Sequence, residues 1–297
     1  GLAVAGVGTA IMKATPDLVL ILGDRYEIMA AATAALLSKV PVAHIAGGDV
    51  TEGAFDDSIR HAITKISSLH FTTTEEAVER VCQMGELPEH VFVTGSPGID
   101  QMKAKPLLQR AAFFESVGLK PQEKNFIITL HPATLATSNA EMAHSMLKAL
   151  DSFSKTGFIF TGSNADPEAD EIDNIIQAWV AKKNHAVFHA SLGSERYFSA
   201  LEHCDLVLGN SSSGIYEASS FQTPTVNIGD RQARRVRAVS VIDCDTDSQA
   251  IQTAIKTALT SDWSSVKSPY GDGRAAKRIL ERLRDITEPK KLIRKSF

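Results

Sequence analysis

The stretch from residue 46 to residue 61, AGGDVTEGAFDDSIRH, sets four carboxylates among glycines and ends on Arg60 and His61. The carboxylates are those of Asp49, Glu52, Asp56 and Asp57. Metal binding, acid/base catalysis and the charged first turn of a helix would each use such a group. The spacing does not match a calcium loop, and His44 with His61 does not form an HExxH helix. The sequence therefore disfavours a metal site and leaves the other two uses open.

Polar side chains also follow other apolar runs. LILGDRYE places Asp24 and Arg25 after one run, and LHPAT places His131 after another. Asp24 either caps the next helix or acts on a ligand, and an arginine at a helix N-terminus suits an anion. His131 has a structural alternative, as a lone histidine usually does. FTGSNAD places Asn164 at a further strand end, where turn formation is the simpler interpretation.

The stretch DLVLGNSSSGIYEAS is the strongest local signal. It predicts a buried strand and then a serine-rich helix start, whose hydroxyl and backbone N–H groups would bind a diphosphate. Glu217, one turn further on, could accept the hydroxyls of a ribose. A serine-capped helix with a solvated glutamate is the alternative. The chain has no GKS or GKT at this point and GVGTA does not complete GxGxxG, so we predict no NAD site and no cofactor.

The elements that must position these residues are predicted from runs rich in Val, Ile and Leu, such as LVLIL, FIITL and DLVLG. Helix-length amphipathic segments follow the runs, which is typical of parallel strands joined by crossover helices. The sequence therefore predicts an α/β protein with two doubly wound, Rossmann-like units. The polar stretch QMKAKPLLQR suggests domains at residues 1–105 and 106–272, and residues 273–297 are expected to form a helix returning to the first domain. Ligands of such sheets sit beyond the carboxyl ends of the strands.

Composition narrows the class of protein. The 297 residues are 43% hydrophobic and carry a net charge of −4, so we expect a globular protein without nucleic acid or membrane partners. The three cysteines lack CxxC spacing and indicate free thiols in a reducing compartment, the cytoplasm. The chain opens at Gly1 on what resembles the tail of a helix, and we expect it to be a fragment that lacks its first units.

Five motifs occur in order along almost the whole chain: LGDRYE, HIAGGDVTEGAFDDSIRHAITK, LHPAT, GNSSSGIYEASSFQTPTVNIGDRQ and YGDG. Together they resemble the hydrolysing UDP-N-acetylglucosamine 2-epimerases of sialic acid biosynthesis. The resemblance implies the two-domain fold of the B-type glycosyltransferases, with the C-terminal domain holding most of the UDP, and a homodimer or homotetramer. It implies anti elimination of UDP to a glycal, followed by hydration to the free 2-epimer. The implied substrate is UDP-N-acetylglucosamine or a UDP-diacetamido-trideoxyhexose of the legionaminic acid type.

The resemblance also implies roles for individual residues. In the first half it implies catalytic Asp24 and Asp56, with Asp57 as the alternative to Asp56, and sugar-nucleotide contacts from Arg25 and Arg60. In the second half it implies a catalytic His131 and ligand contacts from Asn164, Ser211, Ser212, Glu217 and Arg231. The two serines would bind phosphate, and Glu217 the ribose.

One departure from the family falls in the glycine loop. Well-known members carry a catalytic glutamate before the double glycine, where this chain has Ala46, and the loop here is one residue longer. Asp49 or Glu52 is expected to substitute, and the glycines to let the backbone approach the ligand. A non-hydrolysing 2-epimerase, whose loop usually reads HVEAGLRT, and a non-catalytic UDP-sugar binding module are the alternatives.

Overall fold

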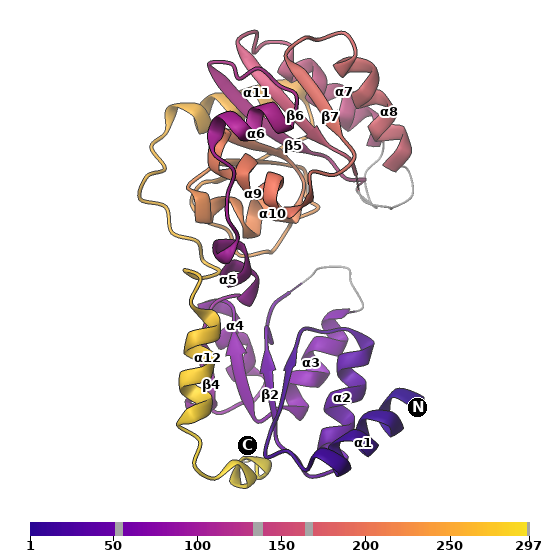
Figure 1. Ribbon diagram of the computed structural model, residues 1–297, viewed down its shortest axis with the longest axis vertical. Helices are drawn as coiled ribbons and strands as arrows, with labels where there is room; N and C mark the ends of the chain where they lie inside the picture. The colour runs from indigo at the N-terminus through magenta and orange to yellow at the C-terminus, as the bar shows by residue number, and fades with distance from the viewer. Residues whose placement is uncertain (51–55, 133–138, 164–168, 296–297) are drawn as a thin grey trace. The chain divides into compact units, whose positions relative to one another are not determined.

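The computed structural model describes residues 1–50, 56–132, 139–163 and 169–295. The chain divides into two compact units (Figure 1). The first comprises Gly1–Lys103, Arg234–Val236 and Pro269–Phe297, and the second comprises Ala104–Ala233 and Arg237–Ser268. None of the helices in the described ranges is both long and apolar enough to cross a lipid bilayer.

The first unit is built on a parallel sheet whose described strands follow one another in the order β1-β2-β3-β4. The strands are β1 (Val19–Leu22), β2 (Val42–Ile45), β3 (Leu69–Thr72) and β4 (Val91–Val93). The helices that follow the first three strands are α2 (Tyr26–Leu37), α3 (Asp56–Ile66) and α4 (Glu75–Gln83). The remaining elements of this unit are α1 (Leu2–Ala14), η1 (Pro88–His90), α5 (Pro97–Ala104), α12 (Ala275–Arg284) and η3 (Pro289–Ile293).

Side chains of β2 alternate between the two faces of this sheet, as the pleat of a strand requires. Val42 packs into a cluster with side chains of α1, α2 and α3, whereas Ala43 and Ile45 pack with Ile279 of α12. The carboxylate of Asp100 on α5 accepts hydrogen bonds from the first two backbone N–H groups of α12, at 2.9 and 2.7 Å. This cap fixes the start of α12, which runs alongside β4 (Figure 1).

The second unit contains a parallel sheet in the order β10-β9-β8-β5-β6-β7. Its strands are β5 (Lys124–Thr129), β6 (Thr156–Thr161), β7 (Ala186–His189), β8 (Leu206–Gly209), β9 (Thr225–Ile228) and β10 (Val241–Cys244). Its helices are α6 (Arg110–Ser116), α7 (Asn139–Leu150), α8 (Ala169–Val180), α9 (Gly193–His203), α10 (Ser212–Tyr216), η2 (Ala218–Phe221) and α11 (Ser248–Thr260). Starting from β7, the strand order is 3-2-1-4-5-6, that of a doubly wound dinucleotide-binding fold.

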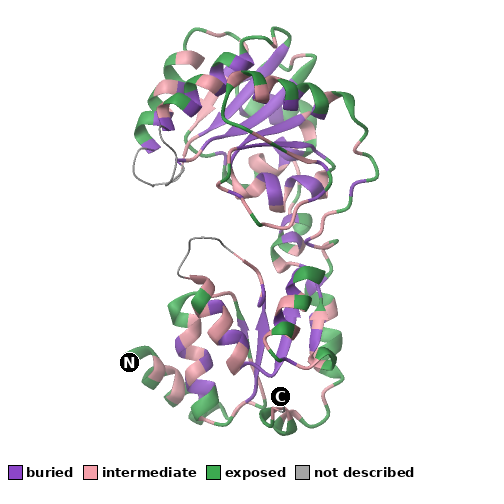
Figure 2. Cartoon of the chain, turned by 180° about the vertical axis from the view of Figure 1, so that it is seen from behind, coloured by how far each residue is buried: buried purple, intermediate pink, exposed green. Residues whose placement is uncertain are grey.

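Helices cover both faces of this second sheet. Phe126 and Ile128 of β5 pack with α7, α8 and α11, and the intervening Ile127 packs with α6 and α9 on the other face. The central strands are accordingly buried along their length (Figure 2). The two parallel sheets confirm the predicted α/β class with two Rossmann-like units.

A buried carboxylate ties the end of the described chain to the first unit. Glu86 accepts hydrogen bonds from Lys65 Nζ at 2.6 Å and His70 Nε2 at 3.0 Å, and pairs with Lys295 Nζ at 2.6 Å. Lys295 also donates to the backbone carbonyl of Ser67. Burial alone would raise the pKa of Glu86, but the hydrogen bonds from His70, Lys295 and Lys65 outweigh burial and lower this pKa to about 2. Glu86 is therefore ionised and multiply paired at neutral pH.

This pairing predicts a specific acid sensitivity. Because the folded pKa of Glu86 lies below its unfolded value, its contribution to stability is complete above about pH 4.5 and is lost as the pH falls toward about 2. The contribution is on the order of 3 kcal/mol. We expect Glu86→Gln to lower the free energy of unfolding at pH 7 and to flatten its fall with acid, measured by urea denaturation across that range.

The matched control is Glu123→Gln, which removes a carboxylate from an exposed pair with Lys155. This variant should keep the wild-type acid dependence, since exposed pairs contribute little. If Glu86→Gln and wild type lost stability in parallel between pH 5 and about pH 2, the role of Glu86 would be refuted.

Candidate active site

In the first unit, three neighbouring strands end at one edge of the sheet with polar residues. Asp24 follows β1, Asp49 follows β2 after the turn of residues 46–48, and Thr73 follows β3. Parallel strands present their carboxyl ends at a common edge, so these side chains share one side of the unit.

Arg60 brings the acidic residues of this edge together. Its buried side chain reaches from α3 and donates from Nη2 to the Asp24 carboxylate and from Nη1 to the Asp57 carboxylate. Nη1 also donates to the backbone carbonyl of Asp49. Of the two carboxylates proposed beside Arg60, Asp57 makes the ion pair, while Asp56 lies in the first turn of α3 and adds negative charge at the helix N-terminus.

Asp49 is hydrogen-bonded to the residue that follows the neighbouring strand β3. Its carboxylate accepts a hydrogen bond from the Thr73 hydroxyl. Burial raises the pKa of Asp49, although the hydrogen bond from Thr73 opposes this. A raised pKa is the direction in which a carboxyl group becomes better suited to general acid catalysis. The other carboxylate predicted to substitute at Ala46, that of Glu52, lies outside the described residues.

The double glycine before Asp49 is required by packing within the chain. A Cβ atom on Gly47 would lie 2.8 Å from Nδ1 of His44, and one on Gly48 would lie 2.5 Å from the carbonyl oxygen of Ala77. Gly48 also has a φ of +81°, which favours glycine. Arg80 of α4 donates to the Gly48 carbonyl. The glycines thus allow the turn to pack against β2 and α4. The sequence had suggested only that they let the backbone approach a ligand, not that they have this packing role.

Arg25 lies apart from the Arg60 group. Its side chain is 71% exposed and pairs with Glu27 at 3.3 Å at the start of α2. Among the described residues, no interaction joins it to Asp24 or Arg60, so its predicted contact with the nucleotide sugar remains a prediction.

In the second unit, the strand order reverses between β5 and β8, and the carboxyl ends of such strands are where ligands bind. Asn210, buried directly after β8, makes two hydrogen bonds to the backbone of His131, the second residue after the end of β5. Its Oδ1 accepts from the His131 backbone N–H at 2.7 Å, and its Nδ2 donates to the His131 carbonyl at 2.8 Å. Arg231 and Gln232 both donate to the Asn210 carbonyl, at 3.2 and 2.9 Å. The structure therefore brings the predicted His131 and Arg231 together around Asn210.

The predicted serines and glutamate lie on and beside α10. Ser211 caps this helix by accepting a hydrogen bond from the Ser213 backbone N–H at 3.4 Å, and Ser212 begins it. Glu217 follows its last residue, and burial raises the pKa of the Glu217 carboxyl group. Its Oε2 is buried and makes no hydrogen bond of good geometry within the described part of the chain. A buried acceptor of this kind is suited to a ligand hydroxyl. Asn164, the last predicted ligand contact, lies outside the described residues.

A cavity of about 390 Å³ opens at the same strand ends. It is lined by Thr129, Thr161, Gly162, residues 190–194, Tyr197, Phe198 and Ser211. Hydroxyl groups and two aromatic rings beside a serine turn suit a small polar ligand with a planar ring. We did not predict Tyr197, Phe198 or Asn210 from the sequence. Tyr197 and Phe198 lie in the run SLGSERYF, which follows the predicted strand AVFHA, and Asn210 is the first residue of NSSSG. These positions after strands were the features of the sequence that could have marked them.

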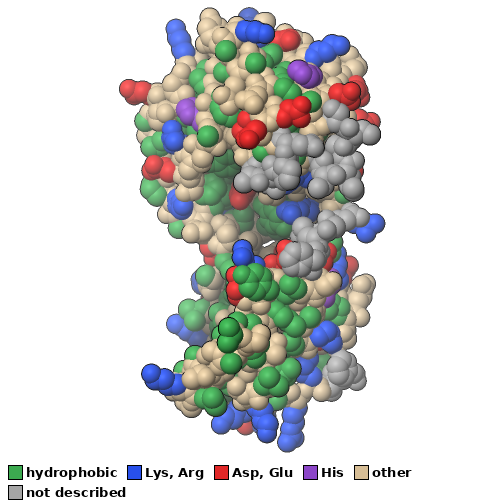
Figure 3. Space-filling view, turned by 90° about the vertical axis from the view of Figure 1, so that its right-hand side faces the viewer, with side chains coloured by type: hydrophobic (Ala, Val, Ile, Leu, Met, Phe, Trp, Pro, Cys, Tyr) green, Lys and Arg blue, Asp and Glu red, His purple; other side chains and the backbone are tan. Residues whose placement is uncertain are grey.

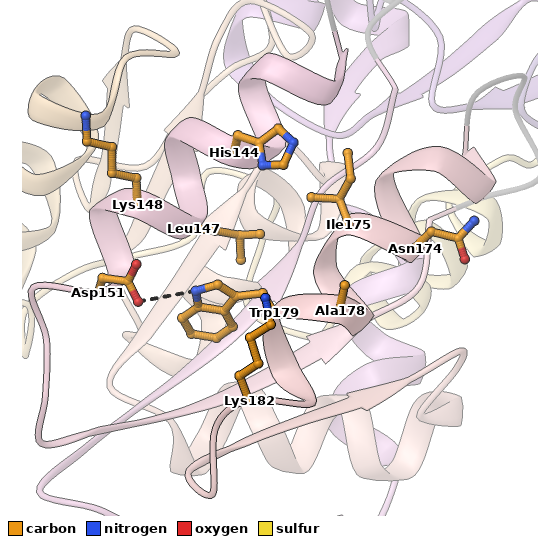
Figure 4. A pocket seen from close by; sticks show the side chains of 9 residues that line it. All are labelled: His144, Leu147, Lys148, Asp151, Asn174, Ile175, Ala178, Trp179 and Lys182. Carbon is orange, nitrogen blue, oxygen red and sulfur yellow. Dashed lines mark hydrogen bonds between the residues drawn. The ribbon is translucent and has the colours of Figure 1, made fainter.

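A second hollow, of about 500 Å³, lies between α7 and α8 (Figure 4). Trp179 forms part of its wall and donates from Nε1 to the Asp151 carboxylate at 3.3 Å. No residue predicted for the site lines this groove, which lies on the helices rather than at the strand ends.

Acidic and basic side chains are interspersed over the face of the second unit shown in Figure 3.

The two Rossmann-like units are those of the B-type glycosyltransferase fold, which solved UDP-GlcNAc 2-epimerases share. Within this fold class, residues 1–284 match the family model described as UDP-N-acetylglucosamine 2-epimerase, and the chain belongs to this family.

Three similar proteins illustrate the relationship. The chain is 39% identical to the GDP/UDP-N,N'-diacetylbacillosamine 2-epimerase (hydrolyzing) of Campylobacter jejuni over 82% of its length, and it spans 64% of that relative. It is 34% identical to the UDP-N,N'-diacetylbacillosamine 2-epimerase (hydrolyzing) of Legionella pneumophila, with 92% and 72% of the two chains covered. The UDP-GlcNAc 2-epimerase of Neisseria meningitidis, solved bound to UDP-GlcNAc, has the same fold, with a TM-score of 0.77, 19% identity and 96% and 80% coverage.

Proposed function

We propose that this protein is a hydrolysing 2-epimerase that converts a UDP-2-acetamido sugar to UDP and the free 2-epimer. The observation that carries the proposal is the pair of carboxylates, Asp24 and Asp57, held by the buried Arg60 at the strand ends of the first unit. Elimination next to a weakly acidic C–H bond needs such a positioned carboxylate. The hydrolysing relatives named above support the overall reaction.

In the proposed first step, Asp24 takes the proton from C2 of the sugar. The electrons of the C2–H bond form the C1=C2 double bond, and the C1–O bond breaks with its electron pair leaving on UDP. In the second step, Asp49 delivers a proton to the opposite face of C2, and water adds to C1 and loses its proton to the solvent. Asp24 then releases the proton that it took from C2 to the solvent, and Asp49 takes up a proton from the solvent, which restores both carboxyl groups. Arg60 orients Asp24, and Thr73 orients Asp49.

The second unit is proposed to hold the nucleotide. Ser211, Ser212 and the backbone N–H groups that begin α10 would bind the diphosphate. His131 and Arg231, together at Asn210, would add positive charge and hydrogen bonds as UDP leaves. The cavity beside Ser211 would take the base. Asp56 stays a predicted catalytic residue, and Arg25 and Asn164 stay predicted ligand contacts.

The substrate is proposed to be a UDP-diacetamido-trideoxyhexose, with UDP-N-acetylglucosamine as the second candidate. Two relatives at 39% and 34% identity are named for UDP-N,N'-diacetylbacillosamine, and Ala46 replaces the glutamate typical of well-known members. We further propose a cytoplasmic homo-oligomer, because its three cysteines are free thiols and because the family resemblance implies an oligomer.

Product analysis tests this proposal. The protein is incubated with each UDP-sugar, and ³¹P and ¹H NMR follow free UDP and the sugar. Free UDP with the free 2-epimer is expected. An epimer still linked to UDP would replace the proposal with a non-hydrolysing 2-epimerase, and binding without turnover would replace it with a UDP-sugar binding module.

Glu217→Ala is expected to weaken the affinity for UDP by about tenfold or more, because a ribose hydroxyl loses a buried acceptor that has no hydrogen-bond partner of good geometry in the described part of the chain. Isothermal titration calorimetry with UDP and with 2′,3′-dideoxy-UDP measures the effect. The wild type should prefer UDP, and the variant should bind both ligands equally. Glu202→Ala, which changes an exposed glutamate of α9, serves as the control. An unchanged preference for UDP in Glu217→Ala would refute the ribose assignment.

A further inference from the structure

His44 lies in β2, beside the strand that leads to Asp24. It is fully buried at the third position of β2, opposite Ile21 of β1 and His70 of β3. Its Nε2 donates to the carbonyl oxygen of Gly23 at 2.9 Å. Gly23 has a φ of +84° and immediately precedes Asp24. This hydrogen bond therefore fixes the turn that presents Asp24.

The other ring nitrogen faces two more segments of the site. Thr64 Oγ1 lies 3.4 Å from Nδ1 of His44, and the same hydroxyl donates to the Arg60 carbonyl at 3.0 Å. A Cβ atom on Gly47 would lie 2.8 Å from Nδ1, so the turn that leads to Asp49 packs against the ring. One imidazole thus contacts the segments that carry Asp24, Arg60 and Asp49.

His44 makes these contacts in its neutral form. Burial lowers its pKa to about 4, although the hydrogen bond to Gly23 opposes this. A neutral imidazole has one N–H group, and Gly23 accepts it, which leaves Nδ1 as an acceptor. The single N–H group of the ring is engaged by Gly23 and the ring is fully buried, so His44 acts through geometry.

We infer that His44 is the positioning residue of the site, which sets Asp24, the Asp49 turn and the helix of Arg60 in register for proton transfer at C2. This inference rests on the proposed function for its catalytic consequence. It requires no contact between His44 and the substrate.

The test compares His44→Leu, which removes both ring nitrogens, with His44→Gln, whose amide N–H is able to reach the Gly23 carbonyl. We expect His44→Leu to lower kcat by about 100-fold, since small misplacements of catalytic groups have effects of this size. The Kd for UDP should stay within about twofold, because the proposed nucleotide contacts lie in the other unit. His44→Gln should recover much of the lost kcat. Wild-type kcat in His44→Leu, or equal loss in both variants, would overturn the inference.

His70→Leu is the matched control. His70 is fully buried and lies opposite His44 on the neighbouring strand β3, but its side chain hydrogen-bonds to Glu86 and not to the Asp24 turn. It should lower the melting temperature while leaving kcat unchanged at temperatures where the protein is folded. Equal losses of kcat in His70→Leu and His44→Leu would mean that disturbing the sheet, not the position of Asp24, causes the effect.

Hydrogen exchange measured by mass spectrometry supplies a readout that does not need turnover. His44→Leu should accelerate exchange in the segments 22–26 and 46–49, and His70→Leu should not. If wild type failed to release UDP, the proposed function would fall, yet this exchange would still decide whether His44 fixes the Asp24 turn. Where His44→Leu does not fold, Gly47→Ala displaces the ring without removing it and should produce the same local change. Wild-type exchange at both segments would overturn the inference.

Discussion

Asp24→Asn is expected to lower kcat by about 1,000-fold or more while changing the affinity for UDP by less than about twofold. Asparagine keeps the size of the side chain and its approach to Arg60 but is unable to accept the C2 proton. Steady-state release of UDP gives kcat, and calorimetry with UDP gives the affinity. The large loss in kcat with UDP binding retained is what a base acting on the sugar requires.

Asp17→Asn is the matched control. Asp17 is an exposed aspartate that lies just before the first residue of β1, whereas Asp24 lies just after the last. It should behave as wild type. Full turnover in Asp24→Asn would remove Asp24 from the mechanism. Loss of UDP affinity to the same degree as kcat would assign Asp24 to binding rather than to proton abstraction.

Gly209→Ala is expected to destabilise the second unit severely, with a loss in the free energy of unfolding of about 4 kcal/mol or more. Gly209 ends β8 with a φ of +128°, and a Cβ atom there would lie 1.9 Å from the carbonyl oxygen of Thr129. Neither backbone is free to move, because β5 and β8 are hydrogen-bonded neighbours in the centre of the sheet. Solubility, circular dichroism and urea denaturation measure the loss.

Gly118→Ala is the control for backbone strain alone. Gly118 has a φ of +67°, but no atom lies within 4 Å of the position of its Cβ. This change should cost only about 1 kcal/mol. Similar stability in the Gly209→Ala and Gly118→Ala variants would contradict the steric account of the β5–β8 junction.

The sequence predicted the parallel sheets because their strands appear as apolar runs, and those in the middle of each sheet are buried on both faces. It also predicted that polar residues after these runs would lie at strand ends. The structure places Asp24, His131 and Arg231 there, and Arg60 reaches Asp24 from α3. The choice between Asp56 and Asp57 was not accessible, because adjacent residues at a helix start differ by about 100° around the axis and only the position of Arg60 distinguishes them.

The supporting residues depend on contacts between distant segments. His44 and Thr73 have no local pattern that marks them, and their partners, Gly23 and Asp49, lie 21 and 24 residues away. Asn210 pairs with His131 across 79 residues. Such pairings follow from strand order and register, which periodicity does not specify.

The central claim, elimination at C2 followed by hydration, is tested most directly by running the reaction in D₂O and analysing the sugar by NMR and mass spectrometry. The account predicts free UDP and a free 2-epimer that carries deuterium at C2 in every molecule, because the second step delivers a solvent-derived proton to that carbon. A free epimer that keeps protium at C2, or a deuterated epimer still linked to UDP, would contradict it.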